Sequence, residues 1–350
     1  MKPLVIISTR LPPATCGIGT YSWLLREHWP NESRAIEFLV VEDVGSSSSD
    51  RISVFGNDAA RMARELDRIG AADLLLHYAG RAYQRFGCPT WLPGVLAKWK
   101  RKFPDSRLMI FFHEMPSIFP RTSRHHWLGK LNTTIIRRLV AKADVLVTNT
   151  EPHRAQLRKL AKGAEVHLVP VGSNIERAPM TSGARARTEF AIFGLPFGRE
   201  QTLQLFAAPL RRWQAAGTVT RLHIIGPEDA RFAAKEISAT VHHGVLPSSE
   251  VADLLRRVGF ALTNVSAETW SKSTTFMACA ANHCPMIISG TRAESGPLSW
   301  TVGIEEVDAI SEPELVRRTS ALASWYEENA AWPVTAKRIA ALWPRQKTTR

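Results

Sequence analysis

The chain has 350 residues, which is enough for two domains of ordinary size. Its hydrophobic content of 45% is that of a globular protein. No apolar run approaches the roughly 20 residues that span a bilayer, and the first residues lack the pattern of a signal peptide. The four cysteines form no CxxC pair and show no metal-ligand spacing, so we expect reduced thiols in a cytoplasmic protein.

The net charge of +13 indicates either an acidic partner or solvated basic helix faces. Three acidic partners would explain it: a phosphorylated substrate, an anionic membrane surface at the inner face of the membrane, and nucleic acid. The basic residues occur in separate pieces such as Lys98–Lys102, Arg137–Arg138 and Arg154–Lys162. Because no basic arm or basic stripe interleaved with aromatic residues stands out, the pattern does not favour nucleic acid.

The first half of the chain alternates buried strands with helical patterns, which is typical of a parallel sheet with crossover helices. In 57–69, for example, the apolar residues fall on one helix face. The strands predicted here are Leu4–Ser8, Ile36–Val41, Asp73–Tyr78, Leu108–His113, Asp144–Asn149 and Val166–Val169.

A polar, Pro- and Gly-containing segment without periodicity, Glu176–Thr188, predicts a domain boundary. A second alternating series follows, with strands at Glu189–Phe193, Arg221–Ile225, Phe260–Asn264 and Met286–Ser289. We therefore predict an α/β protein with two Rossmann-like domains, 1–178 and 179–350, that face each other across a cleft. The last helix, around 332–343, is a candidate to pack back on the first domain.

Ligands of open parallel sheets bind beyond the carboxyl ends of the strands, so the loops after the strands carry the candidate residues. The first such loop is Ser8–Tyr21, where Gly17 and Gly19 would let a ligand approach the backbone at a helix N-terminus. A purely structural turn is the competing interpretation. The loop is not GxGxxG, which argues against a nicotinamide cofactor.

Three further strand ends carry candidates. His113 follows a buried strand and could contact a sugar hydroxyl or act as a base, unless it is a satisfied loop histidine. Asn174 lies in Val169–Ile175, where a binding role and a hinge are equally open. Arg199 follows the strand that ends at Phe193, and its planar fork matches phosphate oxygens, although a solvated helix start would explain it too.

The richest stretch is 244–288, in which Ser248 is expected to cap a helix. After the strand Phe260–Asn264 come the acidic loop residue Glu268 and the sequence Lys272-Ser273-Thr274-Thr275, which opens a helix of small residues. One serine is enough to cap a helix. Three hydroxyls and a lysine therefore favour a cradle for a diphosphate at the helix N-terminus.

With these segments in order, the chain resembles the GT-B glycosyltransferases of the large family that uses nucleotide-sugar donors (family 4-like). The resemblance covers nearly the whole chain. It rests on the glycine loop CGIGTYSWLL, the strand end FFHEM, the segments ADVLVTNTEPHRAQL and VHLVPVGSNI, and the second-half segments LHIIGPED, HGVLPSSEVADLLRR and HCPMII.

The sequence departs from this family at two places. The family usually has an Arg and a Lys after the first strand of its second domain, and here Arg199 is the matching cation while Leu195 stands at the Arg position. The family also has two glutamates separated by seven residues. Glu268 matches the first, which contacts donor sugar hydroxyls, whereas Phe276 stands at the second, which binds the nucleotide ribose.

The resemblance implies a hexosyltransferase-type, retaining and metal-independent enzyme that moves a sugar from a UDP- or GDP-linked donor to a hydroxyl of a carbohydrate or lipid-linked acceptor. It requires no cofactor. It implies that Arg199 and Lys272–Thr275 hold the donor diphosphate, that Glu268 orients the sugar, and that His113 with the Gly17, Gly19 and Asn174 loops serves the substrate. The alternatives are a catalytically silent subunit of the same fold and a sugar-nucleotide epimerase.

Overall fold

The computed structural model describes residues 2–14, 16–30, 34–43, 45, 52–116, 120–178, 185–227, 239–290 and 292–343. The chain divides into two compact units. One unit comprises Met1–Pro170 with Thr335–Arg350, and the other comprises Val171–Val334. Of the segment predicted as the domain boundary, residues 179–184 lie outside the described residues.

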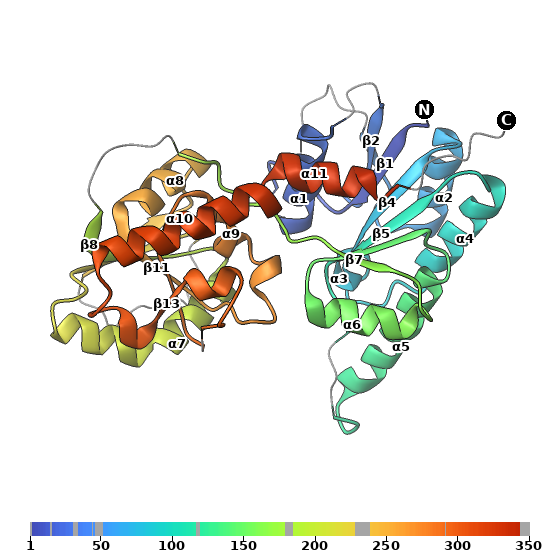
Figure 1. Ribbon diagram of the computed structural model, residues 1–350. Helices are drawn as coiled ribbons and strands as arrows, with labels where there is room; N and C mark the ends of the chain where they lie inside the picture. The colour runs from blue at the N-terminus through green and yellow to red at the C-terminus, as the bar shows by residue number, and fades with distance from the viewer. Residues whose placement is uncertain are drawn as a thin grey trace. The chain divides into compact units, whose positions relative to one another are not determined.

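The first unit is built on a seven-stranded parallel sheet in the order β3-β2-β1-β4-β5-β6-β7 (Figure 1). Helices lie between β1 and β2 and between the successive strands from β3 to β7. Every residue of β1 and β5 is buried, as expected for a sheet covered on both faces. The strands are β1 (Leu4–Ser8), β2 (Ile36–Val40), β3 (Ile52–Val54), β4 (Asp73–Tyr78), β5 (Leu108–Phe112), β6 (Val145–Thr148) and β7 (Val166–Leu168). The helices are α1 (Gly17–Glu27), α2 (Ala59–Ile69), α3 (Gly80–Tyr83), α4 (Leu92–Lys102), α5 (Arg124–Val140) and α6 (Glu151–Leu160).

The second unit has a six-stranded parallel sheet in the order β10-β9-β8-β11-β12-β13. Its strands are β8 (Ala186–Phe193), β9 (Arg221–Ile225), β10 (Thr240–Gly244), β11 (Val258–Thr263), β12 (Met286–Ile288) and β13 (Val302–Gly303). Its helices are α7 (Pro196–Ala215), α8 (Ser248–Arg257), α9 (Thr274–Ala281) and α10 (Glu312–Asn329), with 3-10 turns η1 (Trp270–Lys272), η2 (Pro297–Trp300) and η3 (Ile304–Glu306). A last helix, α11 (Trp332–Ala341), begins in this unit and ends in residues assigned to the first.

The strand order of each sheet reverses direction at one place, between β1 and β4 in the first unit and between β8 and β11 in the second. Loops that leave these strands diverge, and the crevice between them is the usual ligand site of such sheets. The predicted α/β fold with two Rossmann-like units is confirmed, and the strands that bound both crevices were predicted.

One predicted detail is wrong. Ser248 was expected to be the N-cap of its helix, but Pro247 occupies the cap and Ser248 is the first helical residue. The Ser248 Oγ instead accepts a hydrogen bond of 2.7 Å from the backbone N–H of Glu176. A serine at the start of a helix can satisfy a neighbouring segment in place of its own helix, and sequence spacing does not distinguish the two. Within the described residues, no helix has both the length and the apolar character needed to cross a membrane.

Candidate functional site

A cluster of aromatic rings lies at the carboxyl edge of the first sheet. His77 on β4 pairs in register with Phe111 on β5, and alternation along the strand brings His113 onto the face of Phe111. The Phe111 and His113 rings are stacked with centroids 4.5 Å apart. Tyr21 of α1 packs edge-on against all three rings at 5.3–5.4 Å. The cluster therefore fixes the orientation of the His113 ring.

Both histidines of this cluster are held neutral at neutral pH. Burial lowers the pKa of His113 from 6.5 to about 3, and the neighbouring His153 adds a smaller contribution of the same sign. Burial, with a smaller contribution from His113, also lowers the pKa of His77 well below its ordinary value. His113 can therefore offer hydrogen bonds, but it is a weak base for abstracting a proton.

The contact between the two histidines indicates which nitrogen carries each proton. The Nδ1 atom of His77 lies 2.9 Å from the Nε2 atom of His113, so one of the two must be protonated. The Nε2 atom of His77 is buried and has no hydrogen-bond partner among the described residues. A proton there would be a buried donor without an acceptor, at a cost of about 1–3 kcal/mol. The favoured arrangement has His77 Nδ1–H donating to His113 Nε2, which leaves the His113 proton on Nδ1.

The two glycines of the first loop have different roles. Both lie in the first turn of α1, which begins at Gly17. A Cβ added to Gly19 would lie 1.5 Å from the carbonyl oxygen of Arg10, so Gly19 is required for packing of its own loop against the helix. A Cβ added to Gly17 would meet nothing within 4 Å. Of the two, Gly17 alone leaves open space where a ligand could approach the backbone.

Three chain segments converge at the crevice of the second sheet. Gly194 follows β8 with φ +127°, and Gly226 follows β9 with φ +136°, conformations that favour glycine. A Cβ added to Gly226 would lie 2.2 Å from the carbonyl oxygen of Gly194. A Cβ added to Gly194 would lie 3.6 Å from the Oγ1 of Thr275 at the start of α9. The two glycine turns and the N-terminus of α9 therefore border the same space.

The hydroxyl cluster at α9 serves two purposes. Ser273 is the N-cap, and its Oγ accepts a hydrogen bond of 3.2 Å from the backbone N–H of Phe276. Thr274 and Thr275 are the first helical residues, and their backbone N–H groups have no carbonyl of a preceding turn to bind. Lys272, which ends the 3-10 turn η1, is exposed beside them. Donors available to an anion thus remain at Thr274, Thr275 and Lys272, while Ser273 is used in capping.

Arg199 holds the loop after β9 in place. Its side chain is buried, with 2% of the residue exposed, and the guanidinium donates to the backbone carbonyls of Gly226 and Pro227. These bonds hold the Gly226 turn against the start of α7. In this geometry Arg199 orders the crevice wall, and a ligand would have to replace carbonyl contacts in order to reach its guanidinium.

The two positions of the glutamate motif differ in exposure. Glu268 is exposed on the turn before η1, where its backbone N–H bonds the Ser266 Oγ at 3.3 Å. Phe276 is fully buried, and its ring lies 5.7 Å from that of Trp270. A ligand can therefore reach the first position, whereas the second belongs to the interior of the unit.

Asn174 is exposed in a segment that is anchored to α10 and α11. The backbone carbonyl of Ser173 accepts a 2.6 Å hydrogen bond from Trp332 Nε1. The backbone N–H of Ser173 donates to the hydroxyl of Tyr326. A Cβ on Gly172 would lie 2.6 Å from the Trp332 ring. Asn174 belongs to the second unit, whereas His113, Gly17 and Gly19 belong to the first.

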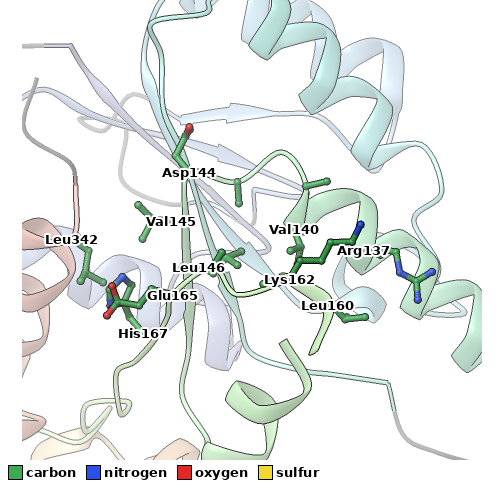
Figure 2. Close-up of a pocket in the computed structure, with 14 residues that line it drawn as sticks. Arg137, Val140, Asp144, Val145, Leu146, Leu160, Lys162, Glu165, His167 and Leu342 are labelled. Atoms are coloured by element: carbon green, nitrogen blue, oxygen red, sulfur yellow. The ribbon is translucent and has the colours of Figure 1, made fainter. Parts of the chain in front are cut away.

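A cavity of about 570 Å³ in the first unit lies away from the histidine cluster (Figure 2). Asp144 and Glu165 line it at the amino ends of β6 and β7, whereas His113 follows the carboxyl end of β5. Because the strands are parallel, these are opposite edges of the sheet. Figure 2 shows Glu165 and His167 on the side of Leu342, with Arg137 and Lys162 across from them. The cavity contains none of the predicted site residues.

Four residues that shape these places were not predicted from the sequence. His77 follows three leucines in β4, and a histidine within such a buried run is a signal that could have marked it as a candidate. Gly194 and Gly226 each directly follow a strand, but their positive φ values cannot be read from sequence. Asn264, at the end of β11, donates to Gln201 of α7 at 3.0 Å and braces the same crevice.

No family model matches the sequence, and no curated protein matches it. Solved structures do match in fold, over almost the full length of both chains. An alpha-glucosyltransferase in complex with UDP has a TM-score of 0.64 at 12% identity, covering 98% of this chain and 100% of the other. An alpha-glucosyltransferase in complex with UDP and a 13-mer DNA containing a HMU base has a TM-score of 0.61 at 12% identity, covering 97% of this chain and 99% of the other. The alpha,alpha-trehalose 6-phosphate synthase of Burkholderia multivorans has 0.65 at 10%, covering 98% of each chain.

At these identities the matches establish the fold. The chain has two parallel-sheet units in the arrangement of secondary structure that defines GT-B glycosyltransferases. The resemblance drawn from the sequence segments is therefore confirmed at the level of fold.

Proposed function

We propose that this protein is a glycosyltransferase that moves a sugar from a nucleotide diphosphate donor to a hydroxyl group of an acceptor. The observation that carries the proposal is the convergence of the Gly194 and Gly226 turns on the N-terminus of α9. A turn without side chains beside free backbone N–H groups is the arrangement that admits and binds a diphosphate. Full-length fold similarity to structures that hold UDP supports the same ligand class.

The second unit would bind the donor. The N–H groups of Thr274 and Thr275, the Thr275 hydroxyl and the Lys272 ammonium would stabilise the negative charge that develops on the leaving diphosphate. Arg199 would act indirectly by holding the Gly226 turn. The exposed Glu268 would accept hydrogen bonds from donor sugar hydroxyls. These groups supply positive potential without a metal, and the proposed nucleotide is uridine or guanosine diphosphate.

The first unit would serve the acceptor. His113 is neutral and carries its proton on Nδ1 in the favoured arrangement, so it would orient a hydroxyl by hydrogen bonding and would not act as a strong base. This role fits a retaining transfer, in which the leaving diphosphate can take the acceptor proton. Gly17 offers the open backbone beside the N-terminus of α1. We propose a carbohydrate or a lipid-linked sugar as the acceptor, and a cytoplasmic site of action.

The binding test uses calorimetry with UDP, GDP and ADP, followed by the corresponding sugar nucleotides. We expect one nucleotide to bind, and we expect Thr275→Val to weaken it about tenfold while Thr275→Ser retains it, because serine keeps the hydroxyl. Ser299→Ala is the matched control, since the Ser299 hydroxyl bonds the Gly296 carbonyl of its own turn. If no nucleotide binds, or if Thr275→Val binds as well as the wild type, the proposed donor site is wrong.

A second candidate function is a catalytically silent subunit of the same fold. The buried Phe276, at the position where the resembling family has its second glutamate, favours it. Turnover separates the two candidates: a silent subunit would leave a bound sugar nucleotide intact with every acceptor and with water. Release of the nucleoside diphosphate in an acceptor-dependent reaction would support the enzyme.

A further inference from the structure

The positive charge of the chain is concentrated in two stretches of the first unit. Residues 79–103 and 120–143 together contain twelve Lys and Arg and no Asp or Glu. Outside them, 33 Lys and Arg stand against 32 Asp and Glu. The cations by themselves are dispersed along the sequence, and their concentration becomes apparent where acidic residues are absent. Nearly the whole net charge of +13 therefore comes from these stretches.

The two stretches are adjacent in the folded unit. The Sγ of Cys88, in the loop before α4, donates to the backbone carbonyl of Leu128 in α5 at 3.4 Å. The hydroxyl of Tyr78 donates to Asn132 one turn further on, at 2.8 Å. Gln84 fixes the loop by accepting from the N–H groups of Phe86 and Cys88. The loop 84–88 and the first half of α5 thus form one surface.

This surface exposes large apolar side chains among its cations. Trp127 is 65% exposed, Phe86 is 60% exposed and Leu131 is 42% exposed. The Lys130 ammonium lies 4.9 Å from the Trp127 ring, and the Arg85 guanidinium lies 5.7 Å from the Phe86 ring. Side chains with both an apolar body and a charged end are typical of groups that sit at a membrane–water interface.

The apolar row of helix α5 is buried in its second half and exposed in its first half. Ile135, Ile136 and Leu139 belong to the core of the first unit. Trp127 and Leu131, which precede Ile135 at i,i+4 spacing, are exposed with Lys130 beside them. A helix on a soluble surface normally presents a polar outer face. Figure 1 shows the start of α5 extending beyond the sheet of the first unit.

Most of the cations of this surface are available to an external partner. Arg81, Arg85 and Lys130 are exposed and form no ion pair with any acidic residue that the structure describes. Lys100 and Lys102, at the far end of α4, are instead paired with Asp144 and Asp67.

We propose that Phe86, Trp127 and Leu131, with Arg81, Arg85 and Lys130, form a docking surface for the headgroup region of an anionic lipid bilayer. The cations are attracted to the lipid phosphates, and the three apolar side chains enter the interface. Large rings and arginine also occur at protein interfaces, so binding to vesicles that contain no protein is the deciding observation. The proposal does not depend on the transferase activity, because docking is measured without nucleotide.

The test is co-sedimentation of the full chain with vesicles, in low salt. We expect binding to equimolar phosphatidylglycerol and phosphatidylcholine, and little binding to phosphatidylcholine alone. The pair Arg85→Gln and Lys130→Gln should weaken binding by about fivefold for each cation removed. The pair Arg61→Gln and Arg64→Gln on α2 removes the same charge elsewhere in the first unit and should have a much smaller effect.

The apolar contribution is tested with Trp127→Ser and Leu131→Ser together, which should weaken binding at least tenfold. Val316→Ser, at a residue of α10 that is 52% exposed, is the control. Brominated lipid should quench tryptophan fluorescence in the wild type and less in Trp127→Phe, which keeps the apolar contact. Equal binding by the Trp127 and Leu131 pair, or binding to arbitrary duplex DNA without binding to vesicles, would overturn the proposal.

Discussion

The Nδ1 atom of His77 lies 2.9 Å from the Nε2 atom of His113, in a pair of histidines that burial keeps neutral. Only His113 reaches the partly exposed edge of the sheet, while His77 is fully buried behind it. The buried ring therefore determines what the outer ring can offer. If His77 donates from Nδ1, then His113 presents its own Nδ1–H as a donor.

This arrangement predicts that His77 is a positioning residue. His77→Leu should lower kcat by about tenfold, the value of one hydrogen bond of ~1.4 kcal/mol, because the His113 ring loses its fixed orientation and protonation. His77→Asn places an amide donor near the former Nδ1 atom and should recover most of the activity. Kinetics against pH for the three proteins provide the measurement.

The pH profile distinguishes positioning from simple packing. In His77→Leu, the apparent pKa of His113 should rise, because the His77 Nδ1–H that donates to Nε2 of the neutral His113 ring is gone. An equal loss of activity in His77→Leu and His77→Asn with an unchanged profile would show that His77 serves only to fill space.

The same pair predicts a loss of stability in acid. The unfolded chain binds a proton on each histidine as the pH falls through about 6.5, whereas folded His113 remains neutral until pH about 3. Between these values the unfolded state binds more protons, so the free energy of unfolding decreases as the pH falls. The stabilisation is complete above pH 6.5 and is lost toward pH 3. Urea unfolding at several pH values should show a shallower dependence for His113→Gln than for the wild type.

An identical dependence in His113→Gln and the wild type would mean that the acid sensitivity comes from other groups. The comparison must be a difference between the two proteins, because carboxylates also lose stabilisation in acid. Glu306 is one example: its pKa is lowered, since the hydrogen bonds from Arg318 and the Gly303 N–H outweigh the opposing effect of burial. The contribution of these carboxylates is common to both proteins and cancels.

The fold was largely predictable because the strands of parallel sheets are short apolar runs between helices. β1, β4 and β9 begin and end at the predicted residues, because all their residues are buried apart from the first residue of β4 and of β9. The strands that were missed, β3, β10 and β13, are short or polar and lie at or near sheet edges. A run such as Thr240–Gly244, with two histidines, carries no apolar signal to mark it as a strand.

The site was less predictable because the sequence shows which residues are close along the chain, but it does not show which hydrogen bonds each side chain forms in the folded protein. Lys272–Thr275 was expected to act together, and the structure shows that Ser273 is already used as a cap. Arg199 was expected to face phosphate, yet its guanidinium is buried on carbonyl groups. The position of Arg199 depends on a tertiary neighbour, the Gly226 turn, that spacing does not specify. The Ser273 cap is a local bond to the Phe276 N–H, but spacing alone did not indicate which hydroxyl of the cluster would form it.

The close contact between the two glycine turns predicts that Gly226→Ala lowers the stability of the protein more than alanine does at a glycine without such a contact. Gly226→Ala should destabilise the protein by about 2–5 kcal/mol, because the residue has φ +136° and its Cβ would lie 2.2 Å from the Gly194 carbonyl oxygen. Gly217→Ala is the matched control: its φ is +75°, but its Cβ would meet nothing within 4 Å. In Gly217→Ala we expect only the backbone strain of a positive φ, which is about 1–2 kcal/mol. Denaturant unfolding measures the loss of stability in both variants. Equal losses would show that the close contact with the Gly194 carbonyl does not contribute to the effect.

The buried Phe276 predicts that the missing carboxylate cannot simply be restored. Phe276→Glu would place an acid where the wild-type ring is fully buried and packs 5.7 Å from Trp270, so we expect a loss of several kcal/mol in unfolding free energy. Phe276→Leu keeps the position apolar and should cost about 1–2 kcal/mol. Thermal and urea unfolding of the two variants provide the test. If Phe276→Glu is as stable as Phe276→Leu and binds the nucleotide more tightly, position 276 lies within reach of the donor, and the silent-subunit candidate loses its support.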